Sequence, residues 1–290
     1  MAKTTLASIN LRRFLVAVLI VLLFSALTAA FYFSPIATGV DWRESFRAGV
    51  LQVLSGKSPY YPETGFVHPP WALIPLFPLA LLPERLGSSI NSVLTITVLF
   101  LVAYKLGARP VALFLFVSTP QLIFSAMNSN IDWLVGLGLL MPPWLGMPFV
   151  LIKPQVGAAI AIYWIIEAWR NDGWKAAVKI SALTICLALL SVLMFGRNLM
   201  GYKILLTYRR VWDFNIFPWG LPIGFALMYW ALKKRIQGFA LLAGPFITSY
   251  IGFYSLPVSI LGALPDNRLF LMLVAALWLL RIIKGMPHIP

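Results

Sequence analysis

Acidic residues and the common metal-binding side chains are scarce in this chain of 290 residues. It contains nine Asp and Glu residues, two histidines and one cysteine. A single cysteine excludes a disulfide framework, and two histidines exclude a histidine-rich metal site. Cys186 lies in an apolar run, where we expect it to be a small helix-packing residue. The residues predict no metal site and require no cofactor, and they leave a need for a divalent metal open.

Motifs of nucleotide-dependent and hydrolytic enzymes are also missing. The sequence has no glycine-rich dinucleotide fingerprint, no Walker phosphate loop, no HExxH helix and no nucleophile elbow. Chemistry that depends on a bound nucleotide or on these hydrolytic centres is therefore not expected.

Apolar residues dominate what is present. Hydrophobic residues make up 60% of the chain and charged residues 11%, and the mean hydropathy is +0.87. A soluble domain could not hide so much apolar surface, so lipid is the expected solvent. Segments near the length of about 20 residues that crosses a bilayer lie at 14–34, 69–83, 88–106, 110–127, 131–145, 147–168, 175–195, 216–232, 237–262 and 269–284.

These segments predict an all-α fold, a polytopic transmembrane helix bundle of about 8–10 spans that forms a single domain over residues 1–290. The first apolar run is longer than the h-region of a signal peptide and lacks a well-placed cleavage site, so we expect a retained span. Several later segments are short or interrupted by proline, which leaves the exact number of spans open.

The formal net charge of +14 comes from basic residues in short clusters between apolar runs, beginning with Lys3, Arg12 and Arg13. Such clusters follow from the positive-inside rule and from anionic headgroups. They predict membrane lipids as partners and no nucleic acid. The expected location is the cytoplasmic (inner) membrane, with the N-terminus in the cytoplasm.

Ten spans place the loops at 169–174 and 233–236 and the C-terminus in the cytoplasm as well. The same count puts Lys105, Arg109 and the basic loop 196–215 outside, against the rule. Either the count is off by one near 105–145, or these bases have a task such as binding a lipid phosphate.

The first extracytoplasmic loop, residues 35–68, carries an expected amphipathic helix that begins at Asp41. Phe46, Val50, Val53 and Leu54 recur at three- and four-residue spacing. Such a helix would lie along the membrane surface, with Gly56 closing it as a C-cap.

Three residues near the expected outer face are candidates for chemistry. Asp41 could act as general base on a hydroxyl, or cap the helix with Glu44 three residues later. His68 could bind phosphate or move a proton, or be an interfacial residue of the aromatic belt. Lys153 could hold a lipid phosphate, or snorkel to the headgroups.

A second group of candidates would contact the substrate. Arg209 and Arg210 suit phosphate recognition or interfacial anchoring, and Tyr60 and Tyr61 could stack on a sugar or serve as membrane aromatics. Asp132 could cap the next helix or belong to a polar site.

The turn at 266–268, which contains Asp266, is expected on the outer side.

Four segments near the start resemble the glycosyltransferase 87 family. They are Asp41-Trp-x-x-Ser-Phe-x-Ala-Gly, Ser55-Gly-Lys-Ser-Pro-Tyr60-Tyr-Pro, Phe66-Val-His-Pro-Pro70 and Pro78-Leu-Ala-Leu-Leu-Pro83. Lys153-Pro-Gln resembles a further element of that family, and Asn128-Ser-Asn-Ile-Asp132 stands where it often has Gly-Gln-x-Asn. His68 replaces the usual tyrosine before Pro-Pro, and the chain is shorter than typical members.

The resemblance implies a GT-C-type membrane glycosyltransferase that takes mannose or arabinofuranose from a polyprenyl-phosphate donor. It implies that Asp41 is the general base, and that Lys153 and the outer arginines bind the donor phosphate. Such a transfer depends on positioning and charge stabilisation and needs no nucleotide.

Two other functions remain open. A shortened, altered member of this family could serve as a non-catalytic scaffold among the subunits of a membrane complex. A lipid or solute transporter is the third possibility, although the scarcity of acids inside the spans argues against coupled transport.

Overall fold

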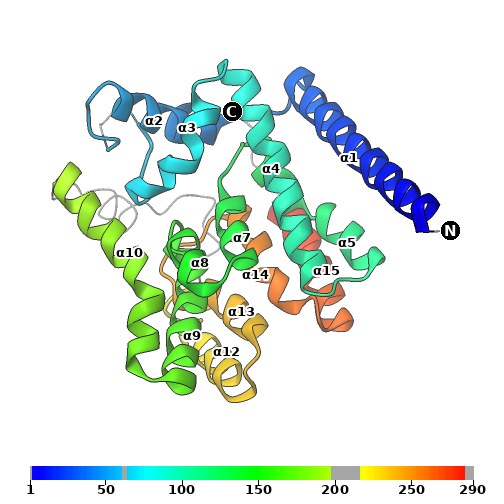
Figure 1. Ribbon diagram of the computed structural model, residues 1–290. Coiled ribbons are helices and arrows are strands. Elements are labelled where there is room, and N and C mark those ends of the chain that lie inside the picture. Colours follow the sequence, from blue (N-terminus) through cyan, green and yellow to red (C-terminus); the bar gives the residue numbers. More distant parts are fainter. Residues whose placement is uncertain (1, 61–63, 197–215, 285–290) are drawn as a thin grey trace.

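All regular elements in the described part of the chain are helices. The computed structural model describes residues 2–60, 64–196 and 216–284 (Figure 1). In chain order the helices are α1 (Ala2–Phe33), η1 (Trp42–Phe46), α2 (Arg47–Leu54), η2 (Pro70–Leu76), α3 (Phe77–Ala80), α4 (Glu84–Lys105), α5 (Pro110–Val117), α6 (Pro120–Met127), α7 (Asp132–Leu140), α8 (Pro143–Val150), α9 (Pro154–Asp172), α10 (Trp174–Phe195), α12 (Leu221–Lys234), α13 (Gln237–Ile247), η3 (Phe253–Ser255), α14 (Leu256–Ile260), η4 (Leu261–Ala263) and α15 (Asn267–Lys284).

Three described helices are long and apolar enough to cross a membrane. They are the Arg13–Phe33 part of α1, α4 and α10, and the pair α5 and α6, bent by 51°, is a fourth if it forms one span. α1 packs against α4 and stands away from the rest of the bundle (Figure 1). α10 is also mostly unburied. Cys186 lies exposed on it, so the expected packing role of this cysteine is wrong.

Proline decides where many of the shorter helices begin. α5, α6, α8 and α9 each start with proline as the first helical residue, where its fixed φ suits the helix and its missing N–H costs nothing. The expected span 131–145 is therefore wrong. It is replaced by α7 and α8, two packed helices of nine and eight residues, each only about 12–14 Å long at 1.5 Å per residue.

The expected span 69–83 is also wrong. η2 and α3 together cover only Pro70–Ala80 and pack against α2. α4 then starts beside the end of α1, where the Arg85 guanidinium lies 5.5 Å from the Tyr32 ring centroid. α1 and α4 therefore run in opposite directions, and Lys105 lies at the end of the bundle where α1 begins. The described residues contain three candidate spans, or four with the bent pair, against the 8–10 expected. Because none of them lies between α1 and α4, Lys105 lies at the same end of the bundle as the N-terminal basic cluster.

The first loop folds largely as its sequence predicts. Residues 42–54 form η1 and α2, and Phe46 and Val50 are buried. Gly56 follows in the left-handed region with φ +76°, and its N–H donates to the Val53 carbonyl. This is the C-cap that the sequence indicates.

The turn before α15 lies at the same end of the bundle as the basic 233–236 loop, not at the opposite end as expected. The backbones of Gly238 and Gly262 touch, so the chain at 262–266 lies near the basic 233–236 loop. α15 runs back from there, and the Arg281 guanidinium lies 5.9 Å from the Phe253 ring centroid. The end of α15 thus lies near η3 rather than beside the start of α1, because α13, η3, α14 and η4 replace the single long span expected over 237–262.

Candidate functional site

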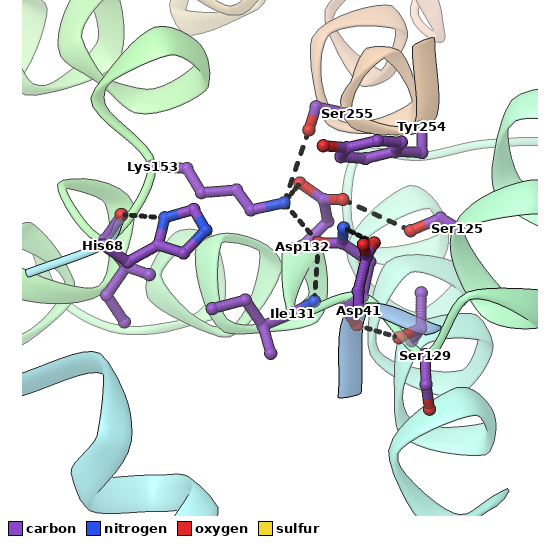
Figure 2. A network of polar contacts seen from close by, with 12 residues as sticks. Asp41, His68, Ser125, Ser129, Ile131, Asp132, Lys153, Tyr254 and Ser255 are labelled. Carbon is purple, nitrogen blue, oxygen red and sulfur yellow. Dashed lines mark hydrogen bonds and ion pairs between the residues drawn. The ribbon is translucent and has the colours of Figure 1, made fainter. Parts of the chain in front are cut away.

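A buried polar network joins four segments that are distant in the sequence (Figure 2). Asp41 precedes η1, Asn130 lies between α6 and α7, Asp132 opens α7 and Lys153 precedes α9. Asn130 Nδ2 donates to Asp41 Oδ2 at 2.6 Å. Lys153 Nζ donates to Asn130 Oδ1 and, at 3.0 Å, to Asp132 Oδ1. The two carboxylates are thus linked through one lysine and one amide.

The amide of Asn130 has only one orientation that satisfies its neighbours. Its Oδ1 accepts from Lys153 Nζ and from the Ile131 backbone N–H at 2.7 Å. Both neighbours are donors, so the oxygen must face them and the NH₂ group must face Asp41. The Lys153 ammonium therefore polarises the Asn130 amide, which makes the NH₂ group a stronger donor to the Asp41 carboxylate.

Lys153 and Asp132 form an ion pair that is closed off from solvent. Their side chains are 1% and 0% exposed. Asp132 Oδ2 accepts from Ser125 Oγ at 3.2 Å, and Lys153 Nζ also donates to Ser255 Oγ at 3.4 Å. The Tyr254 ring centroid lies 5.2 Å from the ammonium. All three N–H bonds of the lysine have acceptors within the protein, so it serves here as an internal counter-ion.

The backbone that presents this network is held in an unusual conformation. Ser129 has φ +57°, a region that costs a non-glycine residue about 1–2 kcal/mol. Ser129 Oγ donates to the Ser88 carbonyl at 2.5 Å and lies 3.0 Å from Ser92 Oγ. These contacts with α4 hold the turn in place. Strain of this kind is common at functional sites.

The network lies below the end of the bundle at which α4 begins. Thr95 Oγ1 donates to the Asn130 carbonyl at 2.9 Å, and Asn91 Nδ2 donates to the Ser129 carbonyl at 2.6 Å. Thr95 is eleven residues into α4, which corresponds to about 16 Å along the helix. Asp41 reaches this depth because its backbone N–H donates to the Asn128 carbonyl at 3.2 Å.

Both proposed helix caps are wrong. Neither Asp41 before η1 nor Asp132 at the start of α7 makes a side-chain capping bond. Each carboxylate bonds instead to a side chain far away in sequence. The alternative reading of Asp132, as part of a polar site, is confirmed. Lys153 does not snorkel, because its ammonium is buried and paired.

His68 lies beside the network and between two cavities. One cavity of about 320 Å³ is lined mainly by apolar side chains of η2 and α10, and a second of about 290 Å³ lies toward residues 247–250. His68 and Pro69 line both. The Nδ1 atom of His68 is 3.3 Å from the Ile152 carbonyl. Desolvation by burial, together with the nearby Lys153 ammonium, lowers the pKa of His68 to about 3, so Nδ1 carries the proton of a neutral ring.

The pKa of His68 predicts a loss of stability in acid. An unfolded histidine titrates near pH 6.5, so between pH 6.5 and about 3 the unfolded chain binds a proton that the folded protein excludes. This contribution is fully present above pH 6.5 and is lost as the pH falls toward 3. In His68→Gln, we expect the drop in melting temperature between pH 7.5 and pH 4.5 to be smaller than in the wild type. Equal drops in the two proteins would contradict the assignment.

Of the remaining candidate residues, Tyr60 is the one that the structure describes. Tyr60 is half-buried, and its hydroxyl donates to the His68 carbonyl at 2.7 Å, which fixes the loop before η2. Tyr61, Arg209 and Arg210 lie outside the described residues. The structure therefore brings together Asp41, Lys153 and the region of His68.

Sequence reasoning missed the residue that connects the site. Asn130 lies within the segment compared with the family motif, but it was not singled out. Ser125, Tyr254 and Ser255 were also missed, because each lies in an apolar stretch with no motif of its own. A signal was present for Asn130, since it stands two residues before an acid at the start of an apolar run.

No family model, curated protein or solved structure matches this chain. Among the described residues, no group of three or more His, Cys, Asp or Glu side chains could hold a metal ion. The residues of the site are therefore what indicates its chemistry.

Proposed function

We propose that this protein is a membrane glycosyltransferase of the GT-C type. It would transfer a sugar from a polyprenyl-phosphate donor to an acceptor hydroxyl at the outer face of the cytoplasmic membrane, with Asp41 as general base. The observation that supports this most is the position of the Asp41 carboxylate. It is half-buried in a membrane bundle and held by Asn130 at 2.6 Å. Polar networks inside a membrane bundle are costly, and they are retained mainly for function.

The proposed reaction needs little beyond positioning. The acceptor oxygen forms a bond to the anomeric carbon of the sugar, and its proton passes to Asp41. The bond between that carbon and the phosphate oxygen breaks, and the electron pair leaves with polyprenyl phosphate. No redox partner, nucleotide or covalent intermediate is required.

The Asn130 bridge suits this role. A base must be ionised to accept a proton, and a hydrogen bond to the ionised form favours that form. Asn130 supplies this bond, and the Lys153 ammonium behind it strengthens the amide as a donor. Lys153 would then act on the base Asp41 through Asn130 and not on the donor phosphate, because its three N–H bonds already have acceptors.

The two cavities beside His68 provide room for the lipid-linked donor. The larger one is bounded by η2 and by the last turns of α10, where Val192 and Phe195 contribute apolar walls. A prenyl chain could enter from the lipid side of α10, with its phosphate toward the polar network. The neutral His68 ring at the cavity boundary could donate to a phosphate oxygen only after turning away from Ile152.

The direct test is transfer of radiolabelled sugar from polyprenyl-phosphate mannose, arabinofuranose and glucose in membranes that contain the protein. Transfer above that of membranes lacking the protein is the expected result. No transfer from any donor, with the protein well folded and co-purifying with a membrane partner, would favour the scaffold function instead.

A second candidate function rests on the buried Asp132–Lys153 pair. Asp132 is the first residue of the half-length helix α7, and Lys153 lies between the half-length helix α8 and the start of α9. Broken helices with buried charges are typical of transporter sites. Reconstituted vesicles would test this. Solute or proton flux that depends on Asp132, without any sugar transfer, would support transport over transfer.

A further inference from the structure

A separate polar cavity lies where α1 ends and α4 begins. Its volume is about 220 Å³. Its wall includes Phe31 of α1, the turn at 37–39, residues 42–43 and the first turns of α4. The apolar span of α1 ends at Phe33, so this cavity lies at the depth of the lipid headgroups rather than of the hydrocarbon core.

Two guanidinium groups, those of Arg43 and Arg85, line the cavity. Both are exposed at the surface. Arg43 forms an ion pair with Glu44 at 3.1 Å, and Arg85 Nη2 lies 3.5 Å from the Ser34 carbonyl. A guanidinium has five N–H donors, so these contacts leave most of them available. The one acid in the wall, Glu84, lies 3.7 Å from Arg47.

The start of α4 adds donors to the same cavity. Pro83 precedes the helix and makes no side-chain capping bond, and Glu84, Arg85, Ser88 and Ser89 of the first turns line the wall. The positive end of this 22-residue helix therefore faces the cavity and favours an anion.

The inner wall of the cavity is built from Trp42 and Gly39. The buried Trp42 indole Nε1–H has no hydrogen-bond partner in the described part of the chain. Gly39 has φ +57°, and a Cβ there would lie 2.3 Å from Ser88 Oγ. The turn at 37–39 can therefore lie this close to α4 only with glycine at position 39.

We propose that this cavity, here called the Arg43–Arg85 cavity, binds the phosphate of an anionic headgroup. The unburied apolar surface of α1 beside the cavity would contact the acyl chains of that lipid. The site differs from the Asp41 network, because Asp41, Asn130 and Lys153 are not among the residues that line the cavity. Binding there does not depend on glycosyl transfer, so the two proposals can fail separately. The shared chemistry is a phosphate group, which either a lipid or a soluble phosphate could supply.

The test compares the wild type with Arg43→Gln/Arg85→Gln in detergent. Native mass spectrometry measures the apparent Kd of the first phosphatidylglycerol bound, and a thermal-shift titration measures binding of sodium phosphate. Since a basic residue at a membrane surface strengthens anionic lipid binding about fivefold, the double variant should bind phosphatidylglycerol about thirtyfold more weakly. The matched control, Lys57→Gln/Arg268→Gln, removes the same charge from exposed basic residues elsewhere on the chain.

The outcomes separate the sources of the phosphate. Loss of lipid binding in the double variant but not in the control supports a lipid site. Loss of a phosphate-induced thermal shift with no change in lipid binding supports a site for soluble phosphate. The proposal is overturned if the double variant and the control lose equal affinity, or if phosphatidylcholine binds as tightly as phosphatidylglycerol. Arg43→Lys/Arg85→Lys, which keeps the charge, should recover much of the binding.

Discussion

Replacing Lys153 with methionine is expected to lower the free energy of unfolding by about 3–5 kcal/mol. Methionine has nearly the same length and volume, so the packing changes little. Asp132, which is 0% exposed and 3.0 Å from the ammonium, loses its counter-ion, and Asn130 Oδ1 loses a donor. An uncompensated buried carboxylate is the reason for the large cost. Equilibrium unfolding in mixed micelles measures it.

Two further variants isolate the ion pair as the cause of this loss. Lys175→Met makes the same change at an exposed position on α10 and should alter the stability by less than about 0.5 kcal/mol. Asp132→Asn/Lys153→Met removes both charges and should be more stable than Lys153→Met alone, because no lone buried charge remains. A single variant as stable as Lys175→Met would show that the pair is not buried in the folded protein.

The second large effect is expected on the proposed transfer reaction. Asp41→Asn should lower the rate of sugar transfer by about 10²–10⁴-fold, the usual contribution of a general base. The amide has the shape of the carboxylate and can still accept the hydrogen bond from Asn130 through its oxygen. The variant should therefore accumulate and unfold like the wild type. Transfer per mole of purified protein, measured with the donor that supports wild-type activity, gives the ratio.

Asp172→Asn is the matched control for this variant. Asp172 is the last residue of α9 and is exposed at the end of the bundle away from the network. Its substitution should leave the transfer rate unchanged. Full activity in Asp41→Asn would remove Asp41 from the reaction. Loss of activity together with a lower melting temperature would assign Asp41 a role in stability instead.

The capping predictions failed for an energetic reason. A helix cap contributes about 1 kcal/mol, whereas a buried carboxylate without a partner costs several times as much. Asp41 and Asp132 both lie at the start of a helix, which is all that the local sequence can indicate. Once packing withdraws Asp132 from solvent, its bond to Lys153 outweighs any capping bond. The sequence contains no sign of that burial.

The span predictions failed where proline and short helices replaced long ones. Mean hydropathy identifies apolar stretches, but it does not distinguish a crossing from a pair of half-length helices. α7 and α8 have the hydropathy of a span and the length of half of one. The prolines that begin α8 and α9 were visible, yet the direction of the following chain depends on what it packs against.

The sequence by itself determined that this chain is helical, that it has apolar segments long enough to cross a membrane, and that a short helix follows the first of them and ends at Gly56. These are properties of composition and of local spacing, and they need no distant partner. Only the tertiary structure decided which polar residues meet. Asp41 lies 89 residues from Asn130, and Lys153 lies 102 residues from Ser255. Contacts at such separations depend on how the helices pack, and a single sequence does not encode that arrangement in any local pattern.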